Sequence, residues 1–339
     1  MRLPFYAALR REFPSETCHI AIMLTSPIAK FLSPLPFFDE IIESPNMSCA
    51  HPIRWIFSRC RFVDSSLRWA LVHKVDVCIN PLRFRSLGHD YILKLTMPNM
   101  SVAYEAKNQV RLFPATAEYQ KARFDKIYTH LMPIITNVSQ IDEMRKILSM
   151  VRGGREAEVL PLSLNEFGAI LDFSVEKNLV KPYVVVVPGA GAGFRRWPVE
   201  RFAHVASRLL CNVVVVGTEE ESALGNQIPC AINLCGKTSL AQLGGVLAGA
   251  CLVIANETGT ATYAAAIGVR TLCLLGGGDF KAYFPNDFYK NTFSIYHYTP
   301  CFSCMWTCSH PNHLGAIAPC VNAINEEEVY NAAKEMLRS

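Results

Sequence analysis

Residues 183 to 276 alternate between short apolar runs and segments of helical periodicity, and this alternation restricts the fold more than any other feature. The apolar runs are 183–188, 212–217, 251–256 and 271–276. They are rich in β-branched residues, which is typical of strands buried on both faces. The helical segments between them are 197–210, 239–248 and 260–267. Strands that alternate with helices predict a parallel sheet with helices on both faces.

The first half of the chain has a similar but less regular texture. Helices are predicted at 6–14 and 135–151, and strands at 19–24 and 75–81. The segment 152–181 has the composition of a crossing between two halves. We therefore expect an α/β protein with two Rossmann-like domains facing a central cleft, one over residues 1–165 and the other over residues 180–339.

Composition excludes several classes of protein. Half of the 339 residues are apolar and 18% are charged, which is typical of a folded globular protein. No stretch has the ~18 to 20 uninterrupted apolar residues of a membrane-spanning helix. The N-terminus lacks the pattern of a secretory signal, and the thirteen cysteines are mostly single and in apolar contexts. A cytoplasmic location is expected.

Charge is distributed unevenly along the chain. Residues 1–150 carry 19 Lys and Arg against 13 Asp and Glu, a net charge of +6, whereas residues 151–339 carry 14 against 16. The basic residues are dispersed, so no nucleic-acid partner is predicted. Two interpretations stay open: a solvated surface, or a surface for an anionic partner or the inner face of the inner membrane.

Two loops that follow predicted strands have the composition of phosphate sites. The first, 188–198, contains Gly189, Gly191 and Gly193 and then Arg195 and Arg196. Glycines allow close approach of the backbone, and guanidinium groups suit phosphate. The spacing G-x-G-x-G differs from the dinucleotide fingerprint G-x-G-x-x-G, so nicotinamide binding is disfavoured. The alternative is a surface loop with solvated arginines.

The second loop joins a strand to a helix of small residues. It contains Glu257, Thr258, Gly259 and Thr260, where the first helical amides would meet phosphate oxygens. The alternative is an ordinary strand-to-helix turn. A third strand is followed by "GTEEES" (217–222), whose glutamates either accept from ribose hydroxyls or favour a helix start, and the helix start is the preferred interpretation.

Four cysteines gather near the C-terminus: Cys301, Cys304, Cys308 and Cys320. The first pair has the spacing of zinc ligands, but the second pair is too far apart for the usual finger. Three outcomes stay open, namely metal binding, disulfide pairing and reduced thiols. No metal is expected in the functional site itself.

Taken together, the blocks "PGAGAGFRRWPVERFAHVASRLL", "VVVVGTEEE" and "INLCGKTSLAQLGGVLAGACLVIANETGTATYAAAIGVRTLCLLGG" resemble glycosyltransferase family 9, the heptosyltransferase family. The resemblance covers most of residues 183–335. It implies a GT-B fold whose second domain holds the nucleotide-sugar donor. It also implies inverting transfer of a sugar, typically heptose from ADP-heptose, onto lipopolysaccharide core or a related anionic glycolipid or glycan, without a cofactor.

The resemblance also assigns residues to the nucleotide-sugar site. Arg195 matches the basic phosphate contact, and Glu221, with Glu219 as a rival, matches the ribose-binding carboxylate. Thr238 and Ser239 fall in the segment near the base. The full expected set is Gly189, Gly191, Arg195, Arg196, Glu221, Thr238, Ser239, Glu257, Thr258, Gly259 and Thr260.

The sequence departs from the family pattern in three respects. Glu257 stands in place of the usual Asp, and Thr262 in place of the usual His. The chain starts at the helix that follows the family's first strand and its Gly-Asp turn, whose Asp is taken as the catalytic base. The catalytic residue is therefore left unassigned. Either the sequence is short at its N-terminus, or the protein binds a nucleotide sugar without transferring it.

Overall fold

The C-terminal part of the chain is built on one six-stranded parallel sheet. The computed structural model describes residues 2–44, 68–83, 87–105, 121–163, 166, 179–306 and 317–338. The sheet order is β11-β10-β9-β6-β7-β8. Its strands are β6 (Tyr183–Val187), β7 (Asn212–Val215), β8 (Ile232–Asn233), β9 (Leu252–Asn256), β10 (Thr271–Leu274) and β11 (Thr292–Ile295). The four apolar runs identified in the sequence are β6, β7, β9 and β10, so those strand predictions are confirmed.

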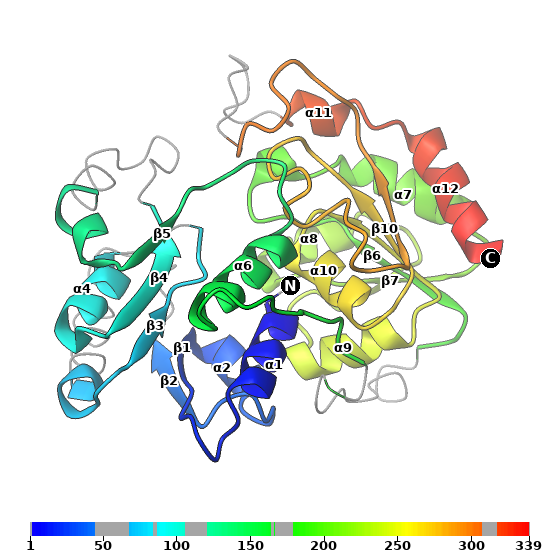
Figure 1. The fold of residues 1–339 in the computed structure, drawn as a ribbon. Helices are drawn as coiled ribbons and strands as arrows, with labels where there is room; N and C mark the ends of the chain where they lie inside the picture. The colour runs from blue at the N-terminus through cyan, green and yellow to red at the C-terminus, as the bar shows by residue number, and fades with distance from the viewer. Residues whose placement is uncertain are drawn as a thin grey trace, which may run out of the picture.

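Helices cover both faces of this sheet (Figure 1). They are η3 (Gly193–Arg195), α7 (Val199–Arg208), η4 (Glu219–Glu221), α8 (Ser222–Gly225), α9 (Leu240–Ala248), α10 (Gly259–Ala266), α11 (Pro319–Asn322) and α12 (Glu326–Arg338). Ser239 caps α9: its hydroxyl accepts from the Gln242 amide, and the Gln242 side chain accepts from the Ser239 amide. These two hydrogen bonds form a capping box, and the helix predicted at 239–248 is confirmed. Gly268, with φ of 84°, ends the α10 segment.

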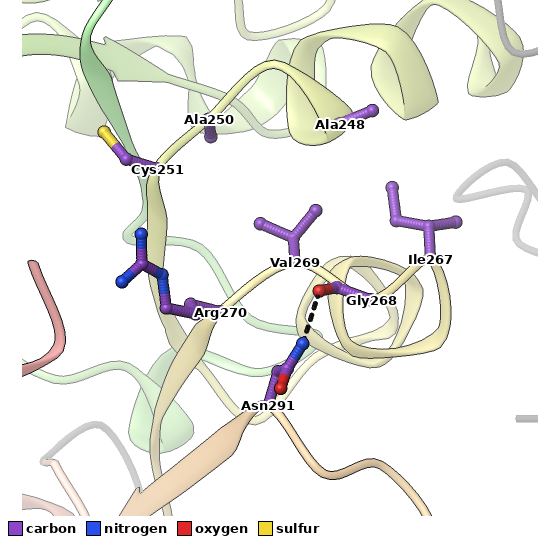
Figure 2. Close-up of a pocket in the computed structure, with 8 residues that line it drawn as sticks. All are labelled: Ala248, Ala250, Cys251, Ile267, Gly268, Val269, Arg270 and Asn291. Carbon is purple, nitrogen blue, oxygen red and sulfur yellow. Dashed lines mark hydrogen bonds between the residues drawn. The ribbon is translucent and has the colours of Figure 1, made fainter. Parts of the chain in front are cut away.

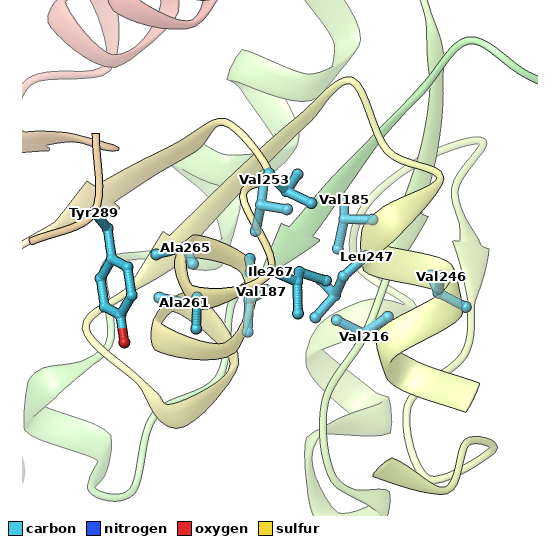
Figure 3. Packing of buried hydrophobic residues seen from close by; sticks show 14 of the residues in the cluster. Val185, Val187, Val216, Val246, Leu247, Val253, Ala261, Ala265, Ile267 and Tyr289 are labelled. Carbon is cyan, nitrogen blue, oxygen red and sulfur yellow. The ribbon is translucent and has the colours of Figure 1, made fainter. Parts of the chain in front are cut away.

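The sheet core explains the β-branched composition of its strands. Val185 of β6 lies opposite Val214 of β7 and Val253 of β9, and all three side chains are fully or almost fully buried. On one face, the small residues Ala261 and Ala265 let α10 approach the strands closely (Figure 3). Trp197 and Phe202 fill the other face. Strands buried on both faces need apolar residues at every position, which is the pattern seen in the sequence.

The N-terminal part contains two smaller parallel sheets. One is β1 (Ala21–Thr25) with β2 (Glu40–Ser44), and the other has the order β3-β4-β5. The remaining elements here are β3 (Val77–Ile79), β4 (Met100–Tyr104), β5 (His130–Met132), η1 (Asp125–Ile127), α1 (Leu3–Glu12), α2 (Ser26–Leu32), α4 (Leu87–Thr96) and α6 (Gln140–Val151). The helix predicted from residue 135 starts at 140, because Asn137 has φ of 61° and Ser139 is the N-cap that accepts from the Ile141 amide.

The C-terminal part has one continuous sheet, whereas the strands of the N-terminal part form two separate sheets. In sequence order the C-terminal sheet is 3-2-1-4-5-6, with β6 between β7 and β9. In the N-terminal part, β1 pairs with β2, and β4 lies between β3 and β5. Within the described residues, no strand pairs with the second edge of β1 or of β3. The side chains described in these two strands are half-buried or exposed, whereas every residue of β6 is buried.

Hydrogen exchange is expected to follow this difference. A strand bonded on one side leaves half of its amides open to water, so amides of β1 and β3 should exchange about tenfold faster than those of β4. β4 is the control because it belongs to the same half and pairs on both sides. Equal protection in β1, β3 and β4 by mass spectrometry would contradict the expectation.

The two parts pack directly on one another. Leu32 and Phe37 belong to the same buried cluster as Ala261 and Ala264 of α10. The Gln140 amide at the start of α6 donates to the Ala282 carbonyl oxygen at 3.0 Å, and α6 lies next to the C-terminal part (Figure 1). Among the helices in the described ranges, none is long and apolar enough to cross a bilayer.

Candidate functional site

The loops after three neighbouring strands meet at the carboxyl edge of the C-terminal sheet. Asn256, the fully buried last residue of β9, holds them together. Its side-chain oxygen accepts from the Trp197 amide at 3.0 Å, and its Nδ2 donates to the carbonyl oxygens of Pro188 and Gly189 at 2.8 and 3.2 Å. The loop after β6 is therefore fixed to the end of β9, at the edge where parallel sheets bind ligands.

A charged cluster lies at this edge. The Nη2 atom of Arg195 is 3.7 Å from Oε2 of Glu257 and 3.9 Å from Oδ2 of Asp279. Nη2 also donates to the Glu257 carbonyl oxygen at 3.4 Å, while the buried Nε of Arg195 has no hydrogen-bond partner. Both carboxylate oxygens of Glu257 are also buried without a hydrogen-bond partner. Buried polar atoms of this kind are normally satisfied, so this cluster has the unmet bonding capacity of a binding site.

The environment of Glu257 changes its ionisation. Burial, with the nearby Asp279 carboxylate as a second cause, raises the pKa of Glu257 to about 8, and the Arg195 guanidinium only partly opposes this. The carboxyl group is therefore largely protonated at neutral pH. In that form it is a hydrogen-bond donor, and it does not repel an anion.

The start of α10 lies beside this cluster. Thr258 is the N-cap residue, and its hydroxyl accepts from the Ala261 amide at 3.2 Å. Gly259 is exposed, and a Cβ there would meet nothing within 4 Å. The space above the first amides of α10 is therefore open, and those amides with the helix dipole favour an anion. Thr260 follows in the same turn and is half-buried.

Glu221 forms a second polar group at this edge. It is 9% exposed and fits against two glycines, because a Cβ on Gly189 would lie 2.0 Å from its Oε1 and one on Gly217 2.7 Å from its Oε2. Its Oε2 accepts from the Thr218 amide at 2.9 Å, so the predicted helix-start role is confirmed. Oε1 lies 3.7 Å from Nη2 of Arg196. The rival candidate Glu219 is exposed.

The remaining predicted residues lie farther along the same edge. Gly191 is exposed at the tip of the glycine loop, and Arg196 turns back to donate to the Ala190 carbonyl oxygen at 3.1 Å. Thr238 and Ser239 follow β8, three strands from β9 in the sheet order, and Ser239 is occupied in capping α9. The structure thus brings together Arg195, Glu257 and Thr258, and separately Glu221, Gly189 and Arg196.

Tyr283 of the C-terminal part contacts the N-terminal part. The Tyr283 hydroxyl accepts from Nε2 of Gln140 at 3.0 Å. Burial raises the pKa of Tyr283, Asp279 and Glu257 raise it further, and the N-terminal cations Arg2 and Arg83 oppose this increase. Charges of both parts therefore act on Tyr283.

The N-terminal part also has buried side-chain donors without hydrogen-bond partners. The Nε of Arg2 and the Nδ2 of Asn80, just after β3, are buried without hydrogen-bond partners. Arg83 is held by Glu143, with Nε 2.8 Å from Oε2. By contrast, Asp39 and Glu40 lie at the amino end of β2, where Asp39 accepts from Arg10 and the Ile20 amide and Glu40 from Trp69. Neither carboxylate is placed to act as a base at this site.

Two other features do not form part of the site. Cys301 and Cys320 are free thiols, Cys304 is half-buried, Cys308 lies outside the described residues, and the described residues contain no group of three possible metal ligands. A hollow lined by Cys251, Arg270 and Asn291 lies at the amino ends of β9 and β10, the edge opposite the site (Figure 2). Its polar groups are engaged, since Arg270 donates to the Met336 carbonyl oxygen and Asn291 to that of Gly268.

Three residues of the site were not identified from sequence: Asn256, Asp279 and Trp306. Asp279 follows three glycines after β10, so "GGGDF" has the same strand–glycine–polar pattern as the other two loops and could have been found. Trp306 comes from the distant cysteine-rich segment, and its Nε1 donates to Oδ2 of Asp279 at 2.7 Å. Nothing in the local sequence indicates that contact.

Comparison with known proteins agrees with this architecture. Residues 155–307 match the family model described as glycosyltransferase family 9 (heptosyltransferase). No curated protein sequence matches the chain.

Solved structures share the fold across nearly the whole chain. A glycosyl transferase family 9 protein from Veillonella parvula DSM 2008 has a TM-score of 0.68 at 17% identity, covering 99% of this chain and 92% of that one. The E. coli ADP-heptose lps heptosyltransferase II gives 0.67 at 15% identity, with coverage of 99% and 93%. The E. coli heptosyltransferase WaaC with ADP gives 0.62 at 14% identity, with coverage of 98% and 94%. The predicted α/β GT-B fold is confirmed, and residues 155–307 resemble glycosyltransferase family 9 through the match to its family model.

Proposed function

We propose that this protein is an inverting glycosyltransferase that moves a heptose from ADP-heptose onto lipopolysaccharide core or a related cell-surface glycan. The match to the family 9 model supports glycosyl transfer, and the family description names heptosyltransferase. The structural neighbours from E. coli are titled as heptosyltransferases, one of them with ADP. The domain limits 1–165 and 180–339 stay a prediction.

One observation carries the proposal: unsatisfied Arg195 and Glu257 lie beside the open N-terminus of α10. A donor diphosphate placed there would receive hydrogen bonds from Arg195 and from the first amides of α10. Glu257, protonated at neutral pH, would donate to a phosphate or sugar oxygen. Glu221 has lone pairs left to accept from ribose hydroxyls, and Thr238 and Ser239 lie farther along the same edge, toward the base.

Chemically, the acceptor hydroxyl oxygen bonds to the anomeric carbon as the bond from that carbon to the diphosphate oxygen breaks. Negative charge develops on the diphosphate, where Arg195 and the α10 amides stabilise it without a metal ion. The hydroxyl proton must pass to a base, which we leave unassigned.

An anionic acceptor and a location at the inner face of the inner membrane complete the proposal. Residues 1–150 carry a net charge of +6, and among their cations Arg2 has a buried Nε without a hydrogen-bond partner. A phosphate- or carboxylate-bearing glycolipid fits these cations. The protein would then be cytoplasmic, with the membrane contact made through its basic half.

Nucleotide binding tests the site. ADP should bind more tightly than UDP or GDP by calorimetry, and Arg195→Ala should weaken ADP about tenfold or more because a phosphate contact is lost. Thr258→Ala should weaken it about threefold by loosening the start of α10. Arg208→Ala is the matched control, since Arg208 is paired with Glu327 on α12 away from the site. Unchanged affinity in Arg195→Ala would contradict the assignment.

Sugar transfer distinguishes an enzyme from the alternative, a nucleotide-sugar-binding protein without transferase activity. ADP-heptose and heptose-free lipopolysaccharide are incubated with the protein, and the mass of the lipid product is measured by mass spectrometry. An added heptose supports transfer. Tight ADP binding without any product, on several truncated acceptors, would favour the binding protein.

A further inference from the structure

Trp306 contacts two charged groups of the site at once. Its Nε1 donates to Oδ2 of Asp279 at 2.7 Å, and the centroid of its ring lies 4.3 Å from Cζ of Arg195. The ring also packs edge-on against Phe194, with centroids 5.7 Å apart. The indole therefore lies where the β6 loop and the β10 loop meet.

The backbone around Trp306 is held in an uncommon conformation. Ser303, Met305 and Trp306 have φ of 68°, 51° and 59°, a backbone region that residues other than glycine rarely adopt. The amides of Ser303 and Met305 donate to the carbonyl oxygens of Gly277 and Gly278 at 2.7 and 2.8 Å. A Cβ on Gly278 would lie 2.1 Å from Cδ2 of Trp306, so only glycine lets the indole lie flat on this loop. The position of the indole is thus fixed from several sides.

The position of the Trp306 indole affects how closely the Asp279 carboxylate can approach Arg195. Asp279 carries a side-chain carboxylate 3.9 Å from Nη2 of Arg195, beyond hydrogen-bond distance. If Asp279 closed on the guanidinium, it would occupy the donors that a diphosphate needs. The same Oδ2 atom accepts from the indole of Trp306, which keeps it at its present distance.

We propose that Trp306 is a positioning residue that restrains Asp279 and thereby keeps the Arg195 guanidinium available for phosphate. The proposal rests on the proposed function, because it concerns the same anion site. It adds a residue from outside the loops that form the site, and it assigns Asp279 as a competitor of the ligand rather than as a contact to it.

A double-mutant cycle on ADP affinity tests the proposal. Trp306→Phe keeps an aromatic ring on the glycines but loses the hydrogen bond, and ADP should bind about fivefold more weakly because Asp279 closes on Arg195. Asp279→Asn should bind ADP as tightly as the unchanged protein or more tightly. In the double variant the loss caused by Trp306→Phe should disappear.

The outcomes that overturn the proposal are distinct from failure of the proposed function. Trp306 does not act through Asp279 if Trp306→Phe leaves the ADP affinity unchanged. The same conclusion follows if Trp306→Phe lowers the ADP affinity by the same factor in the unchanged protein and in the Asp279→Asn variant. Trp69→Phe is the matched control, because that indole also donates to a carboxylate, Glu40, at 2.9 Å, but away from the site. The affinity of the Trp69→Phe variant for ADP should not change.

Titration with pyrophosphate separates the two hypotheses. If pyrophosphate binds and shows the same cycle while ADP and the other nucleotides do not bind, Trp306 restrains Asp279 at an anion site that is not a nucleotide-sugar site. If neither pyrophosphate nor ADP binds the unchanged protein, the anion site and the proposal both fall.

Discussion

Replacing Glu257 by glutamine is expected to raise the free energy of unfolding at pH 9 by about 3 to 5 kcal/mol. The unchanged protein must bury this carboxylate in its charged form at that pH, without a hydrogen bond to either oxygen. Burial raises the pKa of Glu257 from 4.5 to about 8, so ionisation is costly in the folded state. Glutamine has nearly the same shape and carries no charge.

The sign of the pH dependence follows from the same shift. Between pH 4.5 and about 8 the folded protein binds the proton that the unfolded chain has released, so its stability falls as pH rises through this window. Below pH 4.5 the carboxyl is protonated in both states and the cost is absent. The Glu257→Gln variant should lack this slope.

Urea unfolding at pH 5, 7 and 9 measures the effect. Glu200→Gln is the control, because Glu200 is an exposed residue of α7. Its stability relative to the unchanged protein should be the same at each pH within about 0.5 kcal/mol. A Glu257→Gln variant that gains nothing at pH 9 relative to pH 5 would show that the carboxyl ionises freely.

Several elements of the C-terminal half were predictable because each carries its own local signal, namely β6, β7, β9, β10, α7, α9 and α10. β6 and β7 are short β-branched runs, and the start of α9 is encoded by Ser239 and Gln242 three residues later. A strand buried on both faces and a capped helix need only nearby residues to be recognised. The N-terminal half gave weaker signals, since β3 and β5 have three residues each and are only part-buried, and the start of α6 depends on the conformation of Asn137.

The site could be predicted only in part, because its interactions are long-range. Arg195 and Glu257 were identified from their loops, yet the 3.7 Å contact between them depends on Asn256, which joins β9 to the loop after β6. Trp306 reaches Asp279 through three residues with positive φ that are not glycine. Such conformations are over-determined by tertiary contacts and leave no local sequence signature.

Truncating Trp197 to alanine is expected to lower the free energy of unfolding by about 3 to 5 kcal/mol. Its side chain is 1% exposed and packs edge-on against Phe202, with ring centroids 4.8 Å apart. Its Nε1 donates to the Ile324 carbonyl oxygen at 3.0 Å, which links the loop after β6 to the segment before α12. Alanine would leave a cavity between these elements.

The milder variant Trp197→Phe separates packing from hydrogen bonding. It keeps a ring in the same space and loses only the donor, and the Ile324 carbonyl oxygen still accepts from Nη1 of Arg201 at 3.0 Å. The expected cost is therefore about 1 kcal/mol. Leu210→Ala, at a fully exposed position shortly after α7, is the control and should change stability by less than about 0.5 kcal/mol. If Trp197→Phe costs as much as Trp197→Ala, the hydrogen bond outweighs the cavity. In that case Arg201 alone cannot hold the Ile324 segment against the loop that carries Arg195.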